Sequence, residues 1–266
     1  MRRPILLVSA ITVAAATALA GCGSSSSGGS ATTPSASSSP ALSGEIIVFA
    51  AASLTESFGT IGKQFEAANP GTTVTFNFGA SSTLATQITQ SAPADVFASA
   101  SAKNMNQVVS ANAAGTPTTF AKNVMEVAVP PSNPANVTSI NDLAKSSVKV
   151  AVCEPAVPCG ALAQQIFKNA NITVKPVTEE ADVKATLSKV ELGEVDAGMV
   201  YVTDVKAAGD KVAGVPIPDN VNAATDYPIA TITASKNPAL AQAFVDYVLS
   251  TDGEAVLTAA GFQPPT

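Results

Sequence analysis

Short β-rich runs alternate with amphipathic helical patterns from Gly44 onward, and this alternation limits the possible folds more than any other feature. One helical pattern runs from Glu56 to Ala68, and another, with a proline in its first turn, runs from Pro238 to Leu249. The strand candidates are Glu45–Ala50, Thr73–Phe78, Val124–Val129, Val148–Val152 and Val195–Val202. The alternation predicts an α/β fold with mostly parallel sheets, and about 220 residues favour two lobes over one sheet.

Several residue types that catalysis and metal binding commonly use are missing. The chain of 266 residues has no His and no Trp, and its only arginines are Arg2 and Arg3. Without His, a Ser-His-Asp or Cys-His nucleophile lacks its base, and imidazole metal sites are excluded. A net charge of −6 argues against nucleic acid, which calls for a basic surface. What remains is a binding protein, or an enzyme that uses carboxylates, Ser, Lys or Tyr.

Residues 1–21 have the pattern of a secretory signal peptide. Arg2 and Arg3 precede an uncharged run that is shorter than the roughly 20 residues of a membrane-spanning helix. The run ends in Leu19-Ala20-Gly21-Cys22, which resembles the lipobox of bacterial lipoproteins, a family in which the Cys is acylated. The alternative is an ordinary cleaved signal with a coincidental Cys. Removing residues 1–21 would remove both arginines and leave 12 Lys against 20 acidic residues, a net charge of −8.

Residues 22–43 are predicted to form a tether. Ser24 to Ser43 contain ten serines and no charge, a composition typical of flexible linkers. The folded part is therefore expected to start near Gly44, held close to a membrane but not in it. No internal repeat is visible.

Cys153 and Cys159 form an even pair once Cys22 is assigned to a lipid. Outside the cytoplasm such a pair favours a disulfide, here closing a loop of about seven residues worth about 2–2.5 kcal/mol. The alternative is two free thiols.

Five strand-to-helix turns are the candidate binding region, because ligands of α/β sheets bind where strands end and helices begin. Ser53 and Glu56 have the S-x-x-E spacing of a capping box, and Ser81 opens a second helix with three hydroxyl residues in a row. Both features are also consistent with simple helix capping.

Three further turns lie later in the chain. Pro158-Cys159-Gly160 opens a helix with bare N–H groups, and Glu179–Val183 places acidic residues where they suit a first helical turn. A strand ends at Tyr201, which could equally be a packed aromatic residue.

The order and spacing of these turns resemble the periplasmic molybdate-binding proteins of ABC transporters. The similarity covers Gly44 to Phe262 and rests on an ordered set of weak motifs. They are A-A-A-S-L-T at 50–55, S-S-T-L-A-x-Q-I at 81–88, Ala92–Phe97, G-x-V-Y at 198–201, Tyr227-Pro228 and Gly261-Phe262.

The resemblance implies a hinged, two-lobed periplasmic-binding-protein fold of type II, in which each lobe is a mixed, mostly parallel sheet flanked by helices. Lobe 1 would comprise residues 44–123 and 228–266, and lobe 2 residues 124–227.

The resemblance also implies a set of ligand-binding residues. Ser53 and Ser81 would each give a hydroxyl and a backbone N–H to a tetrahedral oxyanion, and Tyr201 would give its hydroxyl. Cys159 and Val183 would each give a main-chain N–H. Cys159 stands where the family commonly has Ala, and the loop before it is one residue shorter here.

The implied function is extracytoplasmic binding of molybdate, with tungstate as a second candidate, by a monomer that needs no cofactor and no cationic metal. The ligand would pass to an ABC permease with a separate ATPase subunit, because the chain has no G-x-x-x-x-G-K-[ST] motif. Contact with the membrane would be through the lipid anchor on its outer face only. The alternatives are a receptor for sulfate or another oxyanion, a structural or adhesive lipoprotein, and a secreted hydrolase using two of Asp95, Glu154 and Asp196.

Overall fold

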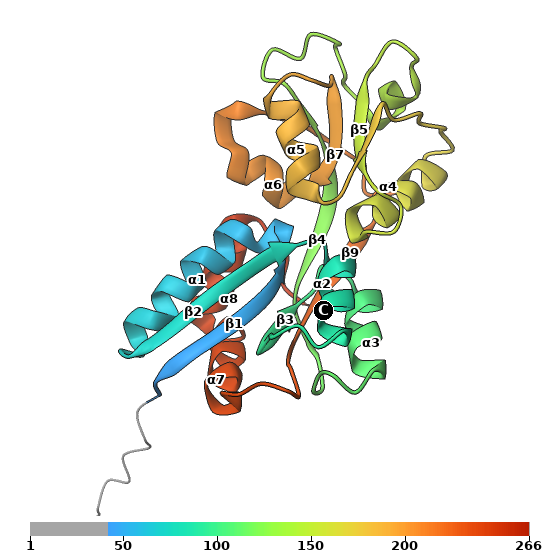
Figure 1. Cartoon of the computed structure of the whole chain (residues 1–266). Coiled ribbons are helices and arrows are strands. Elements are labelled where there is room, and N and C mark those ends of the chain that lie inside the picture. Colours follow the sequence, from blue (N-terminus) through green and yellow to red (C-terminus); the bar gives the residue numbers. More distant parts are fainter. Residues whose placement is uncertain (1–41, 266) are drawn as a thin grey trace, which may run out of the picture. The chain divides into compact units, whose positions relative to one another are not determined.

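Alternating strands and helices fill residues 42–265, the part of the chain that the computed structural model describes (Figure 1). The predicted signal peptide, the predicted acylation site Cys22 and nearly all of the predicted Ser-rich tether lie outside these residues. None of the helices within 42–265 is both long and apolar enough to cross a membrane.

A first group of elements comes from both ends of the described chain. Strands β1, β2 and β3 are parallel to one another, with β1 in the centre. The elements are β1 (Gly44–Ala51), the 3-10 turn η1 (Ala52–Leu54), α1 (Thr55–Ala68), β2 (Thr72–Gly79), α2 (Ser81–Thr89), β3 (Val96–Ala98), α3 (Ala102–Ser110), α7 (Pro238–Val248) and α8 (Thr251–Ala260).

A second group comes from the middle of the chain. Strand β5 pairs in parallel with β6 and β7. The elements are η2 (Ile140–Ala144), β5 (Val150–Cys153), α4 (Pro158–Asn169), β6 (Thr178–Glu180), α5 (Val183–Glu191), β7 (Ala197–Tyr201), α6 (Val202–Ala208), η3 (Gly209–Lys211) and β8 (Ala213–Pro216).

Two long antiparallel strands, β4 (Thr118–Val129) and β9 (Ala224–Thr231), connect the groups (Figure 1). The strand order is β2-β1-β3-β9-β4-β7-β5-β6, with β8 beside β4. Every antiparallel pair in this sheet includes β4 or β9. The mixed sheet thus consists of two parallel parts joined through one antiparallel pair, in a two-lobed α/β fold.

The apolar core divides in the same way. Along β4, Phe120 and Ala121 pack with β1, α1 and α7, whereas Met125 and Val127 pack with β5, α4 and α5. After β8 the chain returns to the first core at Tyr227. A further cluster fills the space between β3, α2 and α3.

The elements expected from periodicity are present, with small shifts at their ends. The helical patterns at 56–68 and 238–249 correspond to α1 and α7. The candidate at Val124–Val129 is only the second half of β4, which begins at Thr118. Glu179 and Glu180 lie in strand β6, so the prediction of an acidic first helical turn is wrong except for Asp182, which caps α5.

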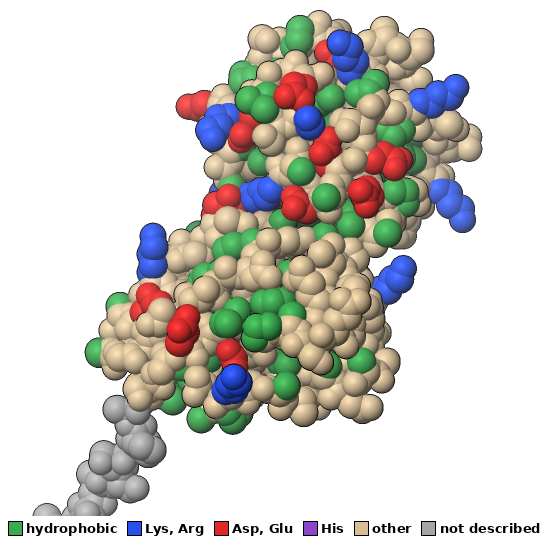
Figure 2. Space-filling view, viewed as in Figure 1, with side chains coloured by type: hydrophobic (Ala, Val, Ile, Leu, Met, Phe, Trp, Pro, Cys, Tyr) green, Lys and Arg blue, Asp and Glu red, His purple; other side chains and the backbone are tan. Residues whose placement is uncertain are grey.

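Charged side chains are scattered over the surface. On the face shown in Figure 2, Lys and Arg side chains of the described residues stand singly or beside acidic groups and form no continuous basic patch. The visible surface therefore lacks the electrostatic footprint of a nucleic-acid-binding face.

Phe58 of α1 organises the core of the first group. Its side chain is fully buried, and its ring centroid lies 5.7 Å from Phe120, 6.1 Å from Phe244 and 6.2 Å from Phe76. These rings belong to β4, α7 and β2, so one side chain joins α1 to the strand that follows it and to two elements that are distant in sequence.

Replacing Phe58 with Ala is expected to lower the free energy of unfolding by about 3–5 kcal/mol, because no neighbouring side chain can fill the space of a ring held on several sides. Urea unfolding of the variant measures the loss. Phe58→Leu is the matched control and should cost less than the alanine variant. A loss below about 1 kcal/mol in Phe58→Ala would contradict this account of the core.

Candidate functional site

A small cavity of about 20 Å³ lies where the two groups of elements meet. Its lining includes all five residues that the sequence nominates, Ser53, Ser81, Cys159, Val183 and Tyr201. The remaining lining residues are small or apolar except for one carboxylate: Ala51, Ala52, Gly79, Ala80, Ala100, Pro158 and Asp182. Neither Lys nor Arg is among them.

Ser81 is the first residue of α2 and is buried. Its Oγ accepts a hydrogen bond from the Ala100 N–H at 2.9 Å. A backbone N–H can only donate, so the Ser81 hydroxyl keeps its own hydrogen for another acceptor. The helix offers no acceptor for the N–H groups of its first turn, so Ser81 has two donors at the cavity.

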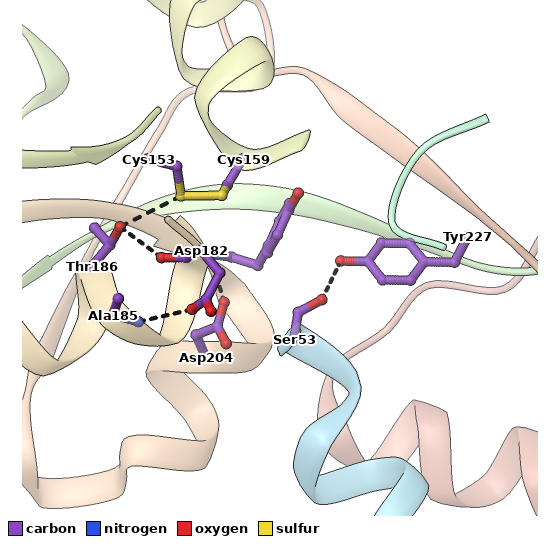
Figure 3. The surroundings of a disulfide bond; sticks show 9 residues. Ser53, Cys153, Cys159, Asp182, Ala185, Thr186, Asp204 and Tyr227 are labelled. Atoms are coloured by element: carbon purple, nitrogen blue, oxygen red, sulfur yellow. Dashed lines mark hydrogen bonds between the residues drawn. A yellow bond between two sulfur atoms is a disulfide. The ribbon is translucent and has the colours of Figure 1, made fainter. Parts of the chain in front are cut away.

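Ser53 does not form the predicted capping box. It lies inside the turn η1, α1 begins only at Thr55, and no side chain caps that helix. The Ser53 Oγ instead lies 2.8 Å from the Oη of Tyr227, a residue 174 positions away (Figure 3). The local spacing of Ser53 and Glu56 therefore suggested the wrong partner for both side chains.

Cys159 and Val183 bring helix N-termini to the cavity. Pro158 opens α4, and because proline has no N–H, Cys159 carries the first N–H of that helix. Val183 opens α5, and its side chain is buried in the second core. Helix N-termini carry partial positive charge, so both positions suit an anion.

A disulfide joins Cys153 at the end of β5 to Cys159 (Figure 3). The loop between them packs tightly, since a Cβ on Gly160 would collide with the carbonyl oxygens of Cys153 and Glu154. Thr186 Oγ1 lies 3.4 Å from Cys153 Sγ and donates to the Asp182 carbonyl at 3.2 Å. The bridge thus links the start of α4 to the start of α5.

Asp182 is a lining residue that the sequence reasoning did not nominate. It is the N-cap of α5, and its Oδ1 accepts a hydrogen bond from Ala185 N at 3.0 Å. An Asp directly before a helix is the signal that could have identified it.

Tyr201 ends β7 and is buried, yet its Oη has no hydrogen-bond partner among the described residues. Burial raises the pKa of this phenol, and the neighbouring Tyr227 and Asp204 raise it further, so the hydroxyl stays protonated at neutral pH. A buried donor without an acceptor costs free energy, and this one lies at the wall of a cavity. The position is therefore suited to a ligand that accepts a hydrogen bond.

An ion triad flanks the cavity and was also missed by the sequence reasoning. Lys184 Nζ lies 2.8 Å from Glu56 of α1 and 3.2 Å from Asp204 of α6. Glu56 lies three positions after Ser53, Lys184 comes directly after Val183, and Asp204 lies three positions after Tyr201. Only the fold brings them together, so no local pattern could have identified the triad.

Asp204 is fully buried, and burial raises its pKa to about 6 although Lys184 and the Tyr201 N–H both favour its charged form. The two carboxylates in turn raise the pKa of Lys184 by more than burial lowers it. The lysine therefore stays charged between them.

The carboxylates considered for a hydrolase do not meet. Asp95 accepts a hydrogen bond from Ile47 N in the first group of elements, and Asp196 accepts one from Lys149 N in the second group. Glu154 is exposed within the loop that the disulfide closes, and none of the three lines the cavity. Within residues 42–265, no group of three or more His, Cys, Asp or Glu is placed to hold a metal ion.

Residues 46–263 match the family described as bacterial extracellular solute-binding protein. The chain belongs to this family. It is 42% identical to the molybdate-binding protein ModA of Mycobacterium tuberculosis over 97% of both chains. The family also fits the buried donors, because a solute-binding protein must present unpaired groups to its ligand.

Two solved structures share the fold. The periplasmic molybdate-binding protein of Azotobacter vinelandii aligns with a TM-score of 0.74 at 22% identity, over 83% of this chain and all of that one. The sulfate-binding protein SubI of Mycobacterium tuberculosis aligns with a TM-score of 0.72 at 18% identity, over 83% and 86%. At these identities the likeness concerns the fold alone.

The raised pKa of Asp204 makes the free energy of unfolding depend on pH. Between its ordinary pKa of 3.8 and its folded value of about 6 the folded state binds more protons than the unfolded state, so stability falls as the pH rises through this range. Asp204→Asn removes the titration while leaving an oxygen for the Tyr201 N–H. From pH 4 to pH 7 the unfolding free energy of the variant relative to that of wild type should rise by about 2.5 kcal/mol.

Urea unfolding of both proteins at pH 4, 5, 6 and 7 measures this difference, in which the contributions of the other carboxylates cancel. A difference that does not change with pH would show that Asp204 is not a buried carboxylate of raised pKa.

Proposed function

We propose that this protein binds molybdate, with tungstate as a second candidate ligand, outside the cytoplasm and delivers it to an ABC permease. The observation that carries the proposal is the buried Tyr201 hydroxyl without a partner, at a cavity that four helical first turns also reach. The relatives named ModA support the choice of ligand.

The donor set suits a fully deprotonated oxyanion. Ser53, Ser81 and Tyr201 would donate through hydroxyls, and Ser53, Ser81, Cys159 and Val183 through backbone N–H groups. Helix N-termini and oriented dipoles stabilise a dianion without a lysine or arginine in contact. Hydrogen phosphate carries a proton that needs an acceptor, and burying it unpaired costs about 1–3 kcal/mol.

One carboxylate lies among these donors, but its Oδ1 is engaged by the first turn of its own helix. Sulfate presents no proton either and remains the second candidate class, supported only by the shared fold of the sulfate-binding protein.

The division of the apolar core supports lobe boundaries near Asn123 and Tyr227, with residues 44–123 and 228–266 in lobe 1 and 124–227 in lobe 2. The cavity takes donors from both sides, so closing the lobes would complete the site and signal occupancy to the permease. Acylation of Cys22 would hold the protein at the outer face of the membrane. The protein would act as a monomer, and a separate subunit of the transporter would hydrolyse ATP.

Thermal unfolding with oxyanions tests the function. The protein comprising residues 40–266, which spans the folded unit, is heated with molybdate, tungstate, sulfate or phosphate. A ligand at about 1,000 times its Kd adds roughly 4 kcal/mol, or about 8–16 °C in Tm for a chain of this size. We expect this rise with molybdate and tungstate. A rise with sulfate alone would overturn the ligand, and no rise with any anion would overturn the function.

Single substitutions test the site. Ser53→Ala and Ser81→Ala each remove a hydroxyl but keep the backbone N–H, and each is expected to weaken molybdate binding by about 1–3 kcal/mol, or roughly 5- to 150-fold. Titration calorimetry measures the affinities. Ser82→Ala is the matched control, because Ser82 is the next residue of α2 and does not line the cavity. If both cavity variants bind like wild type, these residues do not form the site.

A further inference from the structure

The two cavity serines differ in what fixes the direction of their hydroxyl groups. The partner of Ser81 is the Ala100 N–H, which can only donate, so the Ser81 hydroxyl is free to donate to the cavity. The partner of Ser53 is the hydroxyl of Tyr227 at 2.8 Å, and in such a pair either oxygen can donate. The use of Ser53 as an anion donor therefore depends on Tyr227.

We propose that Tyr227 is a positioning and specificity-determining residue, whose phenol donates to Ser53 Oγ and so directs the Ser53 hydrogen into the cavity. Tyr227 does not line the cavity, and the proposed role acts through Ser53, the side chain to which its hydroxyl is hydrogen-bonded. The role rests on the proposed binding of an oxyanion at this cavity.

Acidity favours this direction of the hydrogen bond. A phenol, with an ordinary pKa near 10, is far more acidic than an aliphatic hydroxyl, so it is the better donor and the poorer acceptor. Burial raises the pKa of Tyr227, so the phenol keeps its hydrogen. A hydroxyl that accepts one hydrogen bond is polarised and becomes a stronger donor in the next. The Tyr227–Ser53 pair thus strengthens the bond from Ser53 to an anion.

The surroundings hold the phenol in place. The Tyr227 side chain is fully buried, and its ring packs edge-on against Phe262, Tyr201 and Phe120 at centroid distances of 5.2, 6.1 and 6.2 Å. The neighbouring Asn123 side chain is engaged elsewhere: its Nδ2 donates to Thr203 Oγ1 and its Oδ1 accepts from Val124 N. Ser53 Oγ is the hydrogen-bond partner of the Tyr227 hydroxyl, at 2.8 Å.

Fixing Ser53 as a donor also affects selectivity. A monoprotonated anion such as hydrogen phosphate needs an acceptor in the cavity, and a serine held by Tyr227 presents its hydrogen there instead of a lone pair. Without the phenol, Ser53 can rotate and accept the anion's proton. Loss of the Tyr227 hydroxyl should therefore weaken binding of molybdate more than binding of phosphate.

A double-mutant cycle tests the proposal, using Tyr227→Phe, Ser53→Ala and the double variant with molybdate as the calorimetric ligand. Tyr227→Phe keeps the ring and should weaken molybdate binding roughly 3- to 10-fold. In the Ser53→Ala background the same change should alter affinity less than about twofold, because the phenol acts only through Ser53. An equal loss in both backgrounds would mean that Tyr227 has a purely structural role and would overturn the proposal.

Phosphate competition supplies the readout of selectivity. The phosphate Kd is obtained from the competition curve by correcting for the molybdate concentration and the molybdate Kd of each variant, and the ratio of the phosphate Kd to the molybdate Kd should fall in Tyr227→Phe. Tyr247→Phe is the matched control, since it removes a phenol whose hydroxyl lies 3.4 Å from Gln64 on the surface, and it should leave the ratio unchanged. An unchanged ratio in Tyr227→Phe would overturn the specificity role.

A neutron structure of the wild-type molybdate complex tests the direction of the bond without any variant. Deuterium on Tyr227 Oη pointing at Ser53 is the expected result, and deuterium on Ser53 Oγ pointing at Tyr227 would overturn the proposal. Failure of wild type to bind any oxyanion would overturn the proposed function itself. Wild-type binding with an unaffected Tyr227→Phe would overturn only the role of Tyr227.

Discussion

The first turns of α2, α4, α5 and η1 converge on one cavity, and the rest of the structure depends on where these turns begin. Each follows the carboxyl end of a strand: β1 leads into η1, β2 into α2, β5 into α4 and β6 into α5. Parallel pairing of β1 with β2 and of β5 with β6 brings those strand ends to the same edge of each half of the sheet. Local backbone geometry thus provides positive potential in a chain whose only arginines are Arg2 and Arg3.

Three charged side chains, Glu56, Lys184 and Asp204, form a triad beside this cavity, and among the described residues the only carboxylate in the cavity lining is that of Asp182. Lys184 occupies the first turn of α5, where the helix dipole disfavours a cation, and Glu56 and Asp204 offset that disadvantage. Because Glu56 is half exposed, its bond to Lys184 is screened by water and contributes little to stability. The buried pair with Asp204 is less screened, and removing the lysine would leave an uncompensated carboxylate. The triad of one lysine and two carboxylates therefore adds no net positive charge beside the cavity, which leaves the helix N-termini as its source of positive potential.

Long periodic elements could be predicted from sequence, whereas short strands and distant contacts could not. The helices α1 and α7 follow directly from apolar residues at helical spacing, whereas the five proposed ligand-binding residues were implied by a family resemblance that an ordered set of turns carries. The strands β3, β6 and β8 have only three or four residues each, too few for an alternating pattern to stand out. The Ser53–Glu56 spacing predicted a capping box, but a buried phenol and a lysine from distant elements bind these side chains instead. Tertiary contacts override local propensity where a site is assembled from several elements.

The strands that connect the two cores also hydrogen-bond to side chains of η1 and α6. Asn123 of β4 donates to Thr203 in α6, while Tyr227 of β9 contacts Ser53 in η1, and both strand residues are fully or almost fully buried. A rotation of one lobe about β4 and β9 would change the distances between these partners, because the strands themselves would bend or twist there. The hydrogen bond that we propose to orient Ser53 is therefore made by one of the strands that would carry the hinge. In such an arrangement, an anion that needs Ser53 and Tyr201 at once stabilises the lobe arrangement in which both hydroxyls reach it.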